Sequence, residues 1–249
     1  METLSSRKNA YIRHLRLLAD DAEYRRARGQ FLCDGAKTLR EALRFGARIV
    51  SVLWRDAPQE IEGLEGCAQY VAPGDLFDYA SPLKNSPGPL FAVAIRGCGK
   101  PGKLQNAIVL ENVQDPGNVG TVIRTANAFR IGAVILTGSC ADLYQPKTVR
   151  ATMGAIFRQP VITMERDYLR DFLNDQGLPL YCAALSDQAA DLRGISLRHA
   201  AVAIGSEGQG LSAELLAMCD GQVIIPMNPD SESLNAAVAA SVIMWEMAR

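Results

Sequence analysis

The sequence predicts an α/β protein of two domains, and three observations lead to this prediction. Short apolar runs of strand length alternate with helical patterns along the chain, the order that βα units produce. The apolar runs of the second half are nearly continuous, as in parallel sheets covered on both faces. Residues 96–103 combine three glycines, one proline and three basic residues, a composition typical of a linker. We expect domains at 1–95 and 104–249.

In the first half, residues 5–28 are basic and helix-compatible, with apolar side chains at helical spacing. A second helix begins after Gly35, runs to about residue 45 and ends at Gly46, since glycine commonly terminates helices. A third helix is expected at 75–79, and 58–67 is read as helical or irregular. Strands are expected at 31–33, 49–54, 70–71 and 90–95. The proline-rich segment 81–89 is a loop on any interpretation.

The second half alternates in the same way. Strands are expected at 108–110, 133–136, 180–184, 201–204 and 222–225, with another starting at Val161. Helices are expected at 120–129, 147–155, 168–175, 213–218 and 233–247. Asn118 or Thr121 is a candidate N-cap for the first of these helices, and Ser231 or Ser233 for the last. The last helix is apolar nearly all round, so we expect it to be buried in a core or against a partner.

Composition argues against a membrane-spanning or secreted protein and against a metal-binding protein. The chain has 249 residues, 48% of them apolar and 21% charged, which is ordinary for a soluble globular protein. No run approaches the ~20 apolar residues of a membrane span, and the N-terminus has no signal-peptide core, so we expect a cytoplasmic protein without membrane contact. Six scattered cysteines form no C-x-x-C pair and only two histidines are present, His14 and His199. We therefore expect reduced thiols and no metal site.

A glycine pattern in the linker raises one alternative and does not support it. Gly97, Gly99 and Gly102 satisfy G-x-G-x-x-G after an apolar run. In a dinucleotide-binding protein this pattern opens a helix. Here Pro101 interrupts it and the next segment has a strand pattern. A nucleotide-dependent oxidoreductase is therefore not expected.

Charge is unevenly distributed, although the net charge is only −1. Residues 1–50 contain eleven Lys and Arg against six Asp and Glu, and the remainder contains 15 against 21. A basic segment on a mildly acidic body is consistent with a polyanionic partner. Taken alone it is also consistent with a solvated helix face.

Three strings in the second half belong together: NVQDPGNVGTVIRTANA at 112–128, IGSEGQGLS at 204–212 and IPMNPDSESLNAAVAASVIMWEM at 225–247. Each begins at the end of an apolar run, and in α/β proteins ligands bind at the carboxyl ends of strands. The turn before Arg124 offers free N–H groups and a helix dipole, which suit a phosphate. The guanidinium of Arg124 can also hold a phosphate with two hydrogen bonds. Glu207 is an unusual choice for a purely structural glycine turn.

Together the three strings resemble the motifs of the SpoU branch of the SPOUT RNA methyltransferases. The resemblance implies a SPOUT domain with a parallel sheet and a deep trefoil knot in the last third of the chain. Residues 31–54 and 81–94 resemble, more loosely, the substrate-binding domain similar to ribosomal protein L30e that precedes it in many members. The resemblance to the SpoU branch also implies S-adenosylmethionine as cofactor, RNA as partner and a homodimer formed through the C-terminal domain.

The resemblance assigns site residues by position. It implies a catalytic set of Arg124, Asn118, Glu207, Ser233 and Asn235, in which Arg124 works with an RNA phosphate to activate a ribose hydroxyl. It implies a cofactor site of Leu185, Gly205, Ile225, Met227 and Leu234. RNA contacts are expected from Arg7, Lys8, Arg13, Lys84 and Arg150.

The expected activity is methylation of a ribose 2′-hydroxyl in RNA, with ribosomal RNA as the favoured substrate. Two alternatives stay open at this point. The substrate could be a tRNA, or the protein could be a non-catalytic RNA-binding or ribosome-assembly factor on the same fold. Every motif position expected to matter is occupied, which argues against the non-catalytic alternative.

Overall fold

The structure is a computed structural model that describes residues 1–249 except 97–101, 187, 229, 231 and 232. The described residues divide into two compact units. One contains the chain before residue 97 together with Asp142–Phe157, and the other contains the remaining described residues. The predicted division is therefore wrong for 142–157, which we had expected in the second domain. The predicted linker and its glycine pattern fall mostly outside the described residues.

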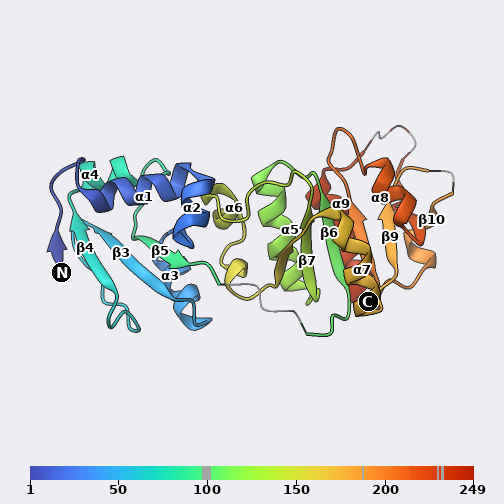
Figure 1. The fold of residues 1–249 in the computed structure, drawn as a ribbon, viewed down its shortest axis with the longest axis horizontal. Helices are drawn as coiled ribbons and strands as arrows, with labels where there is room; N and C mark the ends of the chain where they lie inside the picture. The colour runs from blue at the N-terminus through green and yellow to red at the C-terminus, as the bar shows by residue number, and fades with distance from the viewer. Residues whose placement is uncertain (97–101, 187, 229, 231–232) are drawn as a thin grey trace. The chain divides into compact units, whose positions relative to one another are not determined.

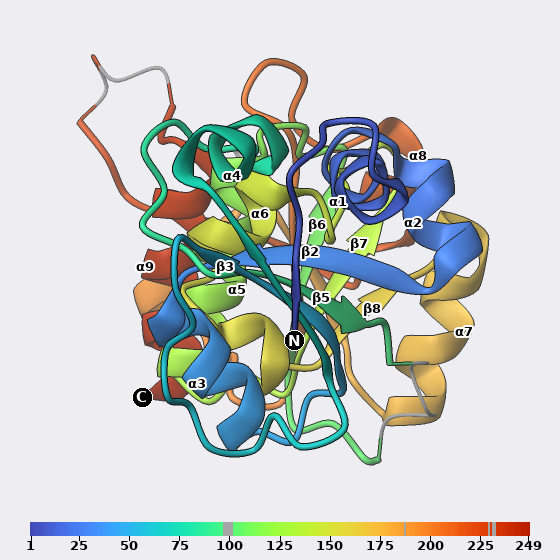
Figure 2. The ribbon, with the colours of Figure 1, turned by 90° about the vertical axis from the view of Figure 1, so that its left-hand side faces the viewer.

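The first unit is a mixed sheet with helices on both faces (Figures 1 and 2). Its strands β1 (Glu2–Thr3), β2 (Gln30–Asp34), β3 (Ile49–Arg55), β4 (Ala68–Ala72) and β5 (Leu90–Ala94) pair in the order β1-β4-β3-β5-β2. Strand β5 is antiparallel to β3 and β2, and the other pairs are parallel. Its helices are α1 (Ala10–Asp20), α2 (Ala22–Arg28), α3 (Ala36–Arg44), α4 (Gly74–Ala80), α6 (Pro146–Ala151) and the short 3-10 helix η1 (Ala155–Phe157).

Alternation along the strands divides the core of this unit into two clusters. Leu32, Leu53 and Leu90 point to the face covered by α1 and α4. Their neighbours Phe31, Val52 and Phe91 point to the face covered by α3. Successive strand residues project to opposite faces, so each strand contributes to both clusters.

The segment 142–157 joins the first unit through apolar and ionic contacts. Val149 is buried in the α3-side cluster, and the ring of Tyr144 lies 4.9 Å from that of Phe31. Arg25, only 4% exposed, donates to Asp142 Oδ2 at 2.6 and 3.1 Å and to the carbonyl oxygens of Leu18 and Ala19. A buried guanidinium with four such bonds holds its carboxylate partner firmly.

One prediction for the first unit needs correction. The helical stretch 5–28 is two helices, because Asp21 adopts an extended conformation and caps α2 by accepting from Tyr24 N at 2.9 Å. Residues 58–67, predicted as helical or irregular, are irregular: they contain turns and no helix or strand. Their two glycines, Gly63 and Gly66, both have positive φ, a conformation that interrupts regular elements.

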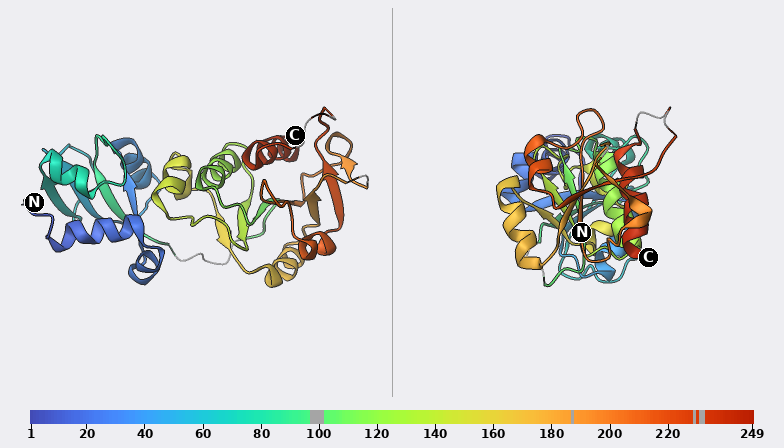
Figure 3. Two further views of the ribbon diagram at one scale, coloured as in Figure 1. Left: turned by 90° about the horizontal axis from the view of Figure 1, so that it is seen from above. Right: turned by 90° about the vertical axis from the view of Figure 1, so that its right-hand side faces the viewer.

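The second unit is a parallel sheet with helices on both faces. Its strands are β6 (Ala107–Glu111), β7 (Ala133–Thr137), β8 (Val161–Thr163), β9 (Leu180–Ala183), β10 (Ala190–Asp191), β11 (Ala201–Ile204) and β12 (Gly221–Ile224). Its helices are α5 (Pro116–Ala128), α7 (Arg166–Gln176), α8 (Ala213–Met218), α9 (Ala236–Ala248) and the 3-10 helix η2 (Leu192–Gly194). Helices α5 and α9 lie on one side of the sheet, and α7 and α8 on the other (Figure 3).

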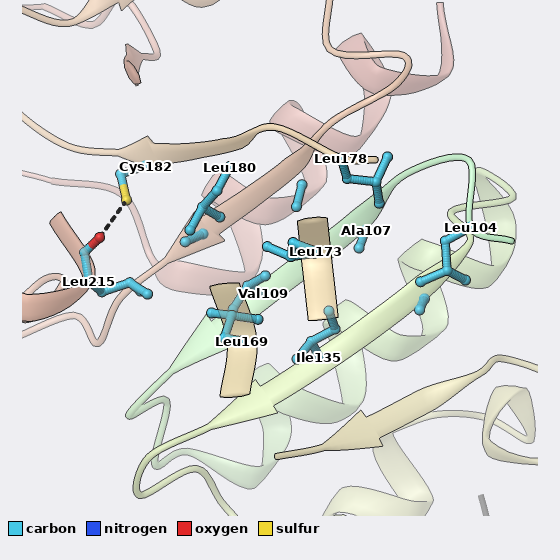
Figure 4. Close-up of a cluster of buried hydrophobic side chains, with 13 residues drawn as sticks. Leu104, Ala107, Val109, Ile135, Leu169, Leu173, Leu178, Leu180, Cys182 and Leu215 are labelled. Carbon is cyan, nitrogen blue, oxygen red and sulfur yellow. Dashed lines mark hydrogen bonds between the residues drawn. The ribbon is translucent and has the colours of Figure 1, made fainter. Parts of the chain in front are cut away.

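The α7 side shows why the strands of this unit have continuous apolar sequences. Leu169 and Leu173 of α7 pack on Val109 and Ile135 (Figure 4), and all four are fully buried. The alternate residues, such as Ile108 and Val134, are equally buried on the other face. The predicted parallel sheet is therefore confirmed, and its strands are apolar on both sides because both sides are covered. The trefoil knot stays a prediction.

Helix α9 is only partly enclosed by this core. Ile243, Met244 and Met247 are buried, whereas Val238 is 49% exposed and Trp245 is 55% exposed. The expectation that this helix is buried in a core or against a partner is therefore met by the core on one face, and for the exposed face burial against a partner stays a prediction. Among the described residues, no helix has both the length and the apolar character needed to cross a membrane.

The strand order brings separate parts of the chain together. The order is β10-β12-β9-β11-β6-β7-β8, so β11 inserts between β6 and β9. All three motif strings follow the carboxyl ends of strands in this sheet, namely β6, β11 and β12. Because the strands are parallel, these ends lie at one edge, where open α/β sheets bind ligands.

Candidate functional site

The first motif forms a turn and the start of α5. Asp115 caps this helix by accepting from Asn118 N at 2.9 Å, and Pro116 occupies the first turn. Proline is favoured there because its missing N–H needs no partner. The helix therefore starts before the predicted residue 120, and neither Asn118 nor Thr121 is its cap. The side chain of Asn118 is left available for other contacts.

The second motif is a closed loop after β11. Ser206 and Gly210 exchange two backbone hydrogen bonds, of 3.2 and 2.8 Å. A Cβ on Gly205 would lie 2.0 Å from the carbonyl carbon of Gly210. Gly205 is therefore required for the loop to close on itself, in addition to any contact with a ligand.

A buried acid fixes the end of this loop. Glu111, the last residue of β6, is 1% exposed and accepts from both the backbone N–H and the hydroxyl of Ser212 at 2.7 Å. Arg166 Nη1 lies 3.4 Å from the same carboxylate. Ser212 also caps α8 by accepting from Leu215 N. Glu111 was not among the site residues predicted from sequence, although an acid at the end of an otherwise apolar strand is a recognisable signal.

The third motif leads from β12 into α9. Asn235 caps α9 by accepting from Ala237 N at 3.0 Å and Val238 N at 3.2 Å. The prediction that Ser231 or Ser233 is the cap is therefore wrong for Ser233, and Ser231 lies outside the described residues. Helix α9 starts at Ala236, three residues later than expected.

Three side chains, one from each motif, meet in a hydrogen-bonded cluster. Asn118 Nδ2 donates to Glu207 Oε1 at 2.9 Å, and Asn235 Nδ2 donates to Asn118 Oδ1 at 3.2 Å. Asn235 Nδ2 also donates to Glu207 Oε1, which accepts from Ala236 N at 3.2 Å. The positions are 89 and 28 residues apart in the chain. One carboxylate thus joins the turn of α5, the glycine loop and the cap of α9.

A cavity of about 520 Å³ opens beside this cluster, at the ends of β9, β11 and β12. All five residues of the predicted cofactor site line it, together with Glu207 and Ser233 of the predicted catalytic set. Its walls are mostly apolar and include residues that the sequence analysis missed, among them Ala183, Ile204, Leu211, Val223 and Ala239. This volume and character are typical of a small-molecule site.

The other predicted residues lie elsewhere. Arg124 is exposed on α5, does not line the cavity and makes no hydrogen bond or ion pair within the described part of the chain.

Lys84 and Arg150 line a second cavity, inside the first unit. Arg7, Lys8 and Arg13 are exposed at the start of the chain, where the guanidinium of Arg7 lies 4.7 Å from the ring centre of Tyr79. In the described residues, no cluster of three or more His, Cys, Asp or Glu side chains is suited to a metal ion.

Comparison with known proteins identifies the family. A model of the SpoU rRNA methylase family matches residues 105–245. The chain belongs to this family. RlmP of Bacillus subtilis, named a 23S rRNA (guanosine(2553)-2'-O)-methyltransferase, is 30% identical over 248 residues, which cover 99% of this chain and 99% of RlmP.

One solved structure of a SpoU methyltransferase agrees with this membership, and a second solved structure has the same fold. The methyltransferase AviRb from Streptomyces viridochromogenes, in complex with AdoMet, matches with a TM-score of 0.86 and 25% identity over 97% of this chain and 98% of its own. The AdoMet-bound rRNA methyltransferase from Sinorhizobium meliloti matches with a TM-score of 0.87 over 98% and 96%. Its 24% identity supports the fold alone. The resemblance stated from the motifs is thus confirmed.

Proposed function

We propose that this SpoU-family protein methylates a ribose 2′-hydroxyl in ribosomal RNA, using S-adenosylmethionine. The observation that carries the proposal is the cluster of Asn118, Glu207 and Asn235 beside a cavity lined by all five predicted cofactor residues. Ribosomal RNA is favoured over tRNA because a relative similar over its whole length is named a 23S rRNA methyltransferase.

The cavity suits the cofactor on chemical grounds. Ile225, Leu185 and Leu234 give it apolar walls for an adenine ring. It lies where β9, β11 and β12 end, so backbone N–H and C=O groups beyond the last paired residues are available to a polar ligand. When bound there, S-adenosylmethionine supplies an activated methyl group. The protein's own residues then have to orient the ribose and manage the proton of its hydroxyl.

Glu207 positions the site. Its Oε1 accepts from Asn118, Asn235 and Ala236 N, which holds the three motifs in register. Its Oε2 has no partner in the described residues and is available to a ribose hydroxyl. The fixed amides of Asn118 and Asn235 restrict where a substrate can sit, and such restriction supplies much of catalysis in transfer reactions.

Arg124 handles the RNA phosphate. Its guanidinium is exposed and unpaired in the described residues, and it projects from a helix whose start is fixed by Asp115 and Pro116. A planar guanidinium binds phosphate oxygens with two hydrogen bonds. A free guanidinium keeps its proton under ordinary conditions, so arginine alone is a very weak base. We infer that the arginine and the phosphate together draw the proton from the hydroxyl.

We further propose that the protein is a cytoplasmic homodimer formed through α9. Val238, Val242 and Trp245 are 49%, 37% and 55% exposed and lie three or four residues apart, on one face of the helix. An apolar helix face of this kind is typical of a subunit interface. Arg7, Lys8 and Arg13 of the first unit are proposed to contact the RNA backbone.

A ribose-methylation map of total RNA, with and without the protein, tests the proposal. We expect loss of one 2′-O-methyl mark in ribosomal RNA when the protein is removed, and its return with the wild-type chain. Loss of a mark in tRNA instead would move the substrate to tRNA. An unchanged map, together with no methyl transfer to RNA by the purified protein, would contradict the enzymatic proposal.

A further inference from the structure

The first unit contains a cavity that the proposed methyl-transfer site does not use. It has a volume of about 330 Å³ and is lined by the end of β2, the loop 82–87 and residues 146–153 in and after α6. This volume is within the range of small-molecule sites. Its polar lining side chains include Asp34, Lys84 and Arg150.

The loop that forms one wall is fixed by internal hydrogen bonds. Ser86, 4% exposed, donates its hydroxyl to Asp34 Oδ2 at 2.5 Å and accepts from Gly88 N at 3.0 Å. Gly35 N donates to Pro89 O at 2.9 Å, which ties the end of the loop to the end of β2. The cavity is therefore formed before any ligand arrives, and a preformed site loses less conformational entropy on binding.

Asp34 and Arg150 place an acceptor and a donor at this cavity. Burial raises the pKa of the Asp34 carboxyl, and its hydrogen bond to Ser86 and the nearby positive charge of Arg150 oppose this shift. Neither residue makes an ion pair within the described part of the chain. Ser86 uses only Oδ2, so Oδ1 remains free to accept. Asp34 is only partly buried and lines the cavity, so this oxygen can accept a hydrogen bond from a ligand bound there.

The rest of the lining is apolar and the rim is cationic. Leu83, Pro82, Pro87, Pro146 and Val149 supply aliphatic surface suited to the face of a planar ring. Lys84 and Arg150 are exposed at the same cavity. Three features therefore have to be matched: the free oxygen of Asp34, the apolar walls and the cationic rim. A planar ring that donates hydrogen bonds at one edge and carries a phosphate would match all three.

We propose that this cavity binds an unpaired guanine nucleotide of the RNA substrate, an inference that rests on the proposed function for its RNA. Guanine has two adjacent donors, N1–H and the exocyclic amine, and one carboxylate can accept from both. Adenine and cytosine present a ring-nitrogen acceptor on this edge, which a carboxylate repels. Proteins read RNA mainly through unpaired bases, by stacking and by contacts to this edge. Lys84 and Arg150 contact the phosphate.

Binding of mononucleotides to the full-length protein tests the proposal directly. We expect guanosine 5′-monophosphate to bind at least about ten-fold more tightly than adenosine 5′-monophosphate, the discrimination typical of a good two-bond base contact. Crosslinking with 6-thioguanosine 5′-monophosphate should label peptides containing residues 82–87 or 146–153. Equal affinity for the two nucleotides, or labelling confined to the second unit, would overturn the assignment.

Two single-residue variants test the proposed contact of Asp34 with the base and that of Lys84 with the phosphate separately. Asp34→Asn keeps the acceptor for Ser86 and should weaken guanosine 5′-monophosphate about ten-fold. The matched control Glu62→Gln removes an exposed acid of the same unit that makes no hydrogen bond or ion pair within the described residues, and it should leave nucleotide affinity unchanged. Lys84 is exposed, so Lys84→Ala should change stability little. It should weaken binding of guanosine 5′-monophosphate but not of guanosine. Wild-type affinity in both Asp34→Asn and Lys84→Ala would refute the proposal.

Methyl transfer to RNA is measured in parallel, so that the two proposals fail separately. If the wild-type protein methylates RNA and shows no guanine preference, the cavity inference is wrong and the proposed function stands. If the guanine preference and the crosslink are present but no RNA is methylated, the proposed function is wrong and the guanine site stands. With both intact, Asp34→Asn should raise KM for RNA with little change in kcat.

Discussion

Glu111→Gln tests how the glycine loop of the second unit is held. The carboxylate is 1% exposed and accepts two 2.7 Å hydrogen bonds from Ser212 and one contact of 3.4 Å from Arg166. Glutamine has the same shape but only one acceptor oxygen, so one donor of Ser212 would face an amide N–H group. A hydrogen bond to a charged group contributes about 1.5–3 kcal/mol. Losing one of these hydrogen bonds, together with the negative charge that faces Arg166, should lower the free energy of unfolding by about 3 kcal/mol.

The assay is thermal and urea unfolding of the full-length protein, with cofactor affinity measured by calorimetry. A loss of this size corresponds to a fall of about 6–12 °C in the Tm of the second unit, and the displaced loop should also weaken S-adenosylmethionine binding. The matched control is Glu214→Gln, which removes a 65% exposed acid lying 3.5 Å from the same Arg166. An exposed pair contributes little, so this variant should stay within about 0.5 kcal/mol of wild type. If Glu111→Gln is as stable as the control, the network does not hold the loop.

Three further predictions concern other parts of the molecule. Arg124→Ala should reduce single-turnover methyl transfer by at least ~10²-fold with cofactor affinity unchanged. Arg124→Lys should be nearly as poor, because lysine lacks the planar guanidinium that binds phosphate with two hydrogen bonds. Near-normal transfer by the alanine variant would assign the proton transfer to another residue. Trp245→Ser, which removes the 55% exposed ring on α9, should shift the mass measured by light scattering from dimer to monomer; an unchanged dimer would place the interface on another face. Partial burial lowers the pKa of His14 between Tyr24 and Gln30, so the unfolded chain binds its proton more readily, and the stability of the first unit should fall as pH drops below ~6.5. His14→Gln should remove that part of the pH dependence, and a variant with the wild-type slope would contradict the assignment.

The positions of the helices and strands were predicted closely wherever the hydrophobic periodicity and the turn or capping residues indicated the same boundaries. The predicted bounds of β11 and α8, 201–204 and 213–218, are those in the structure. Helix starts were less accurate. Asp115 and Asn118 are both good caps, and Asn235 competes with Ser233 in the same way. Local sequence does not choose between such neighbouring candidates: Asn118 donates to Glu207 and caps no helix, whereas Asn235 donates to Glu207 and also caps α9.

The sequence by itself determined the α/β class and the parallel sheet of the second unit, because these depend on patterns repeated every two to four residues. Its resemblance to a known family also indicated five of the residues that line the cavity, because those residues lie in motifs that follow strands. Only the tertiary structure decided that 142–157 packs with the first unit, that Glu111 holds Ser212, and that Asp34, Lys84 and Arg150 line one cavity. Arg25 and Asp142 are 117 residues apart, and Glu111 and Ser212 are 101 apart. Such pairs form only when the packed core brings distant segments together, and local sequence patterns contain no information about partners at that separation.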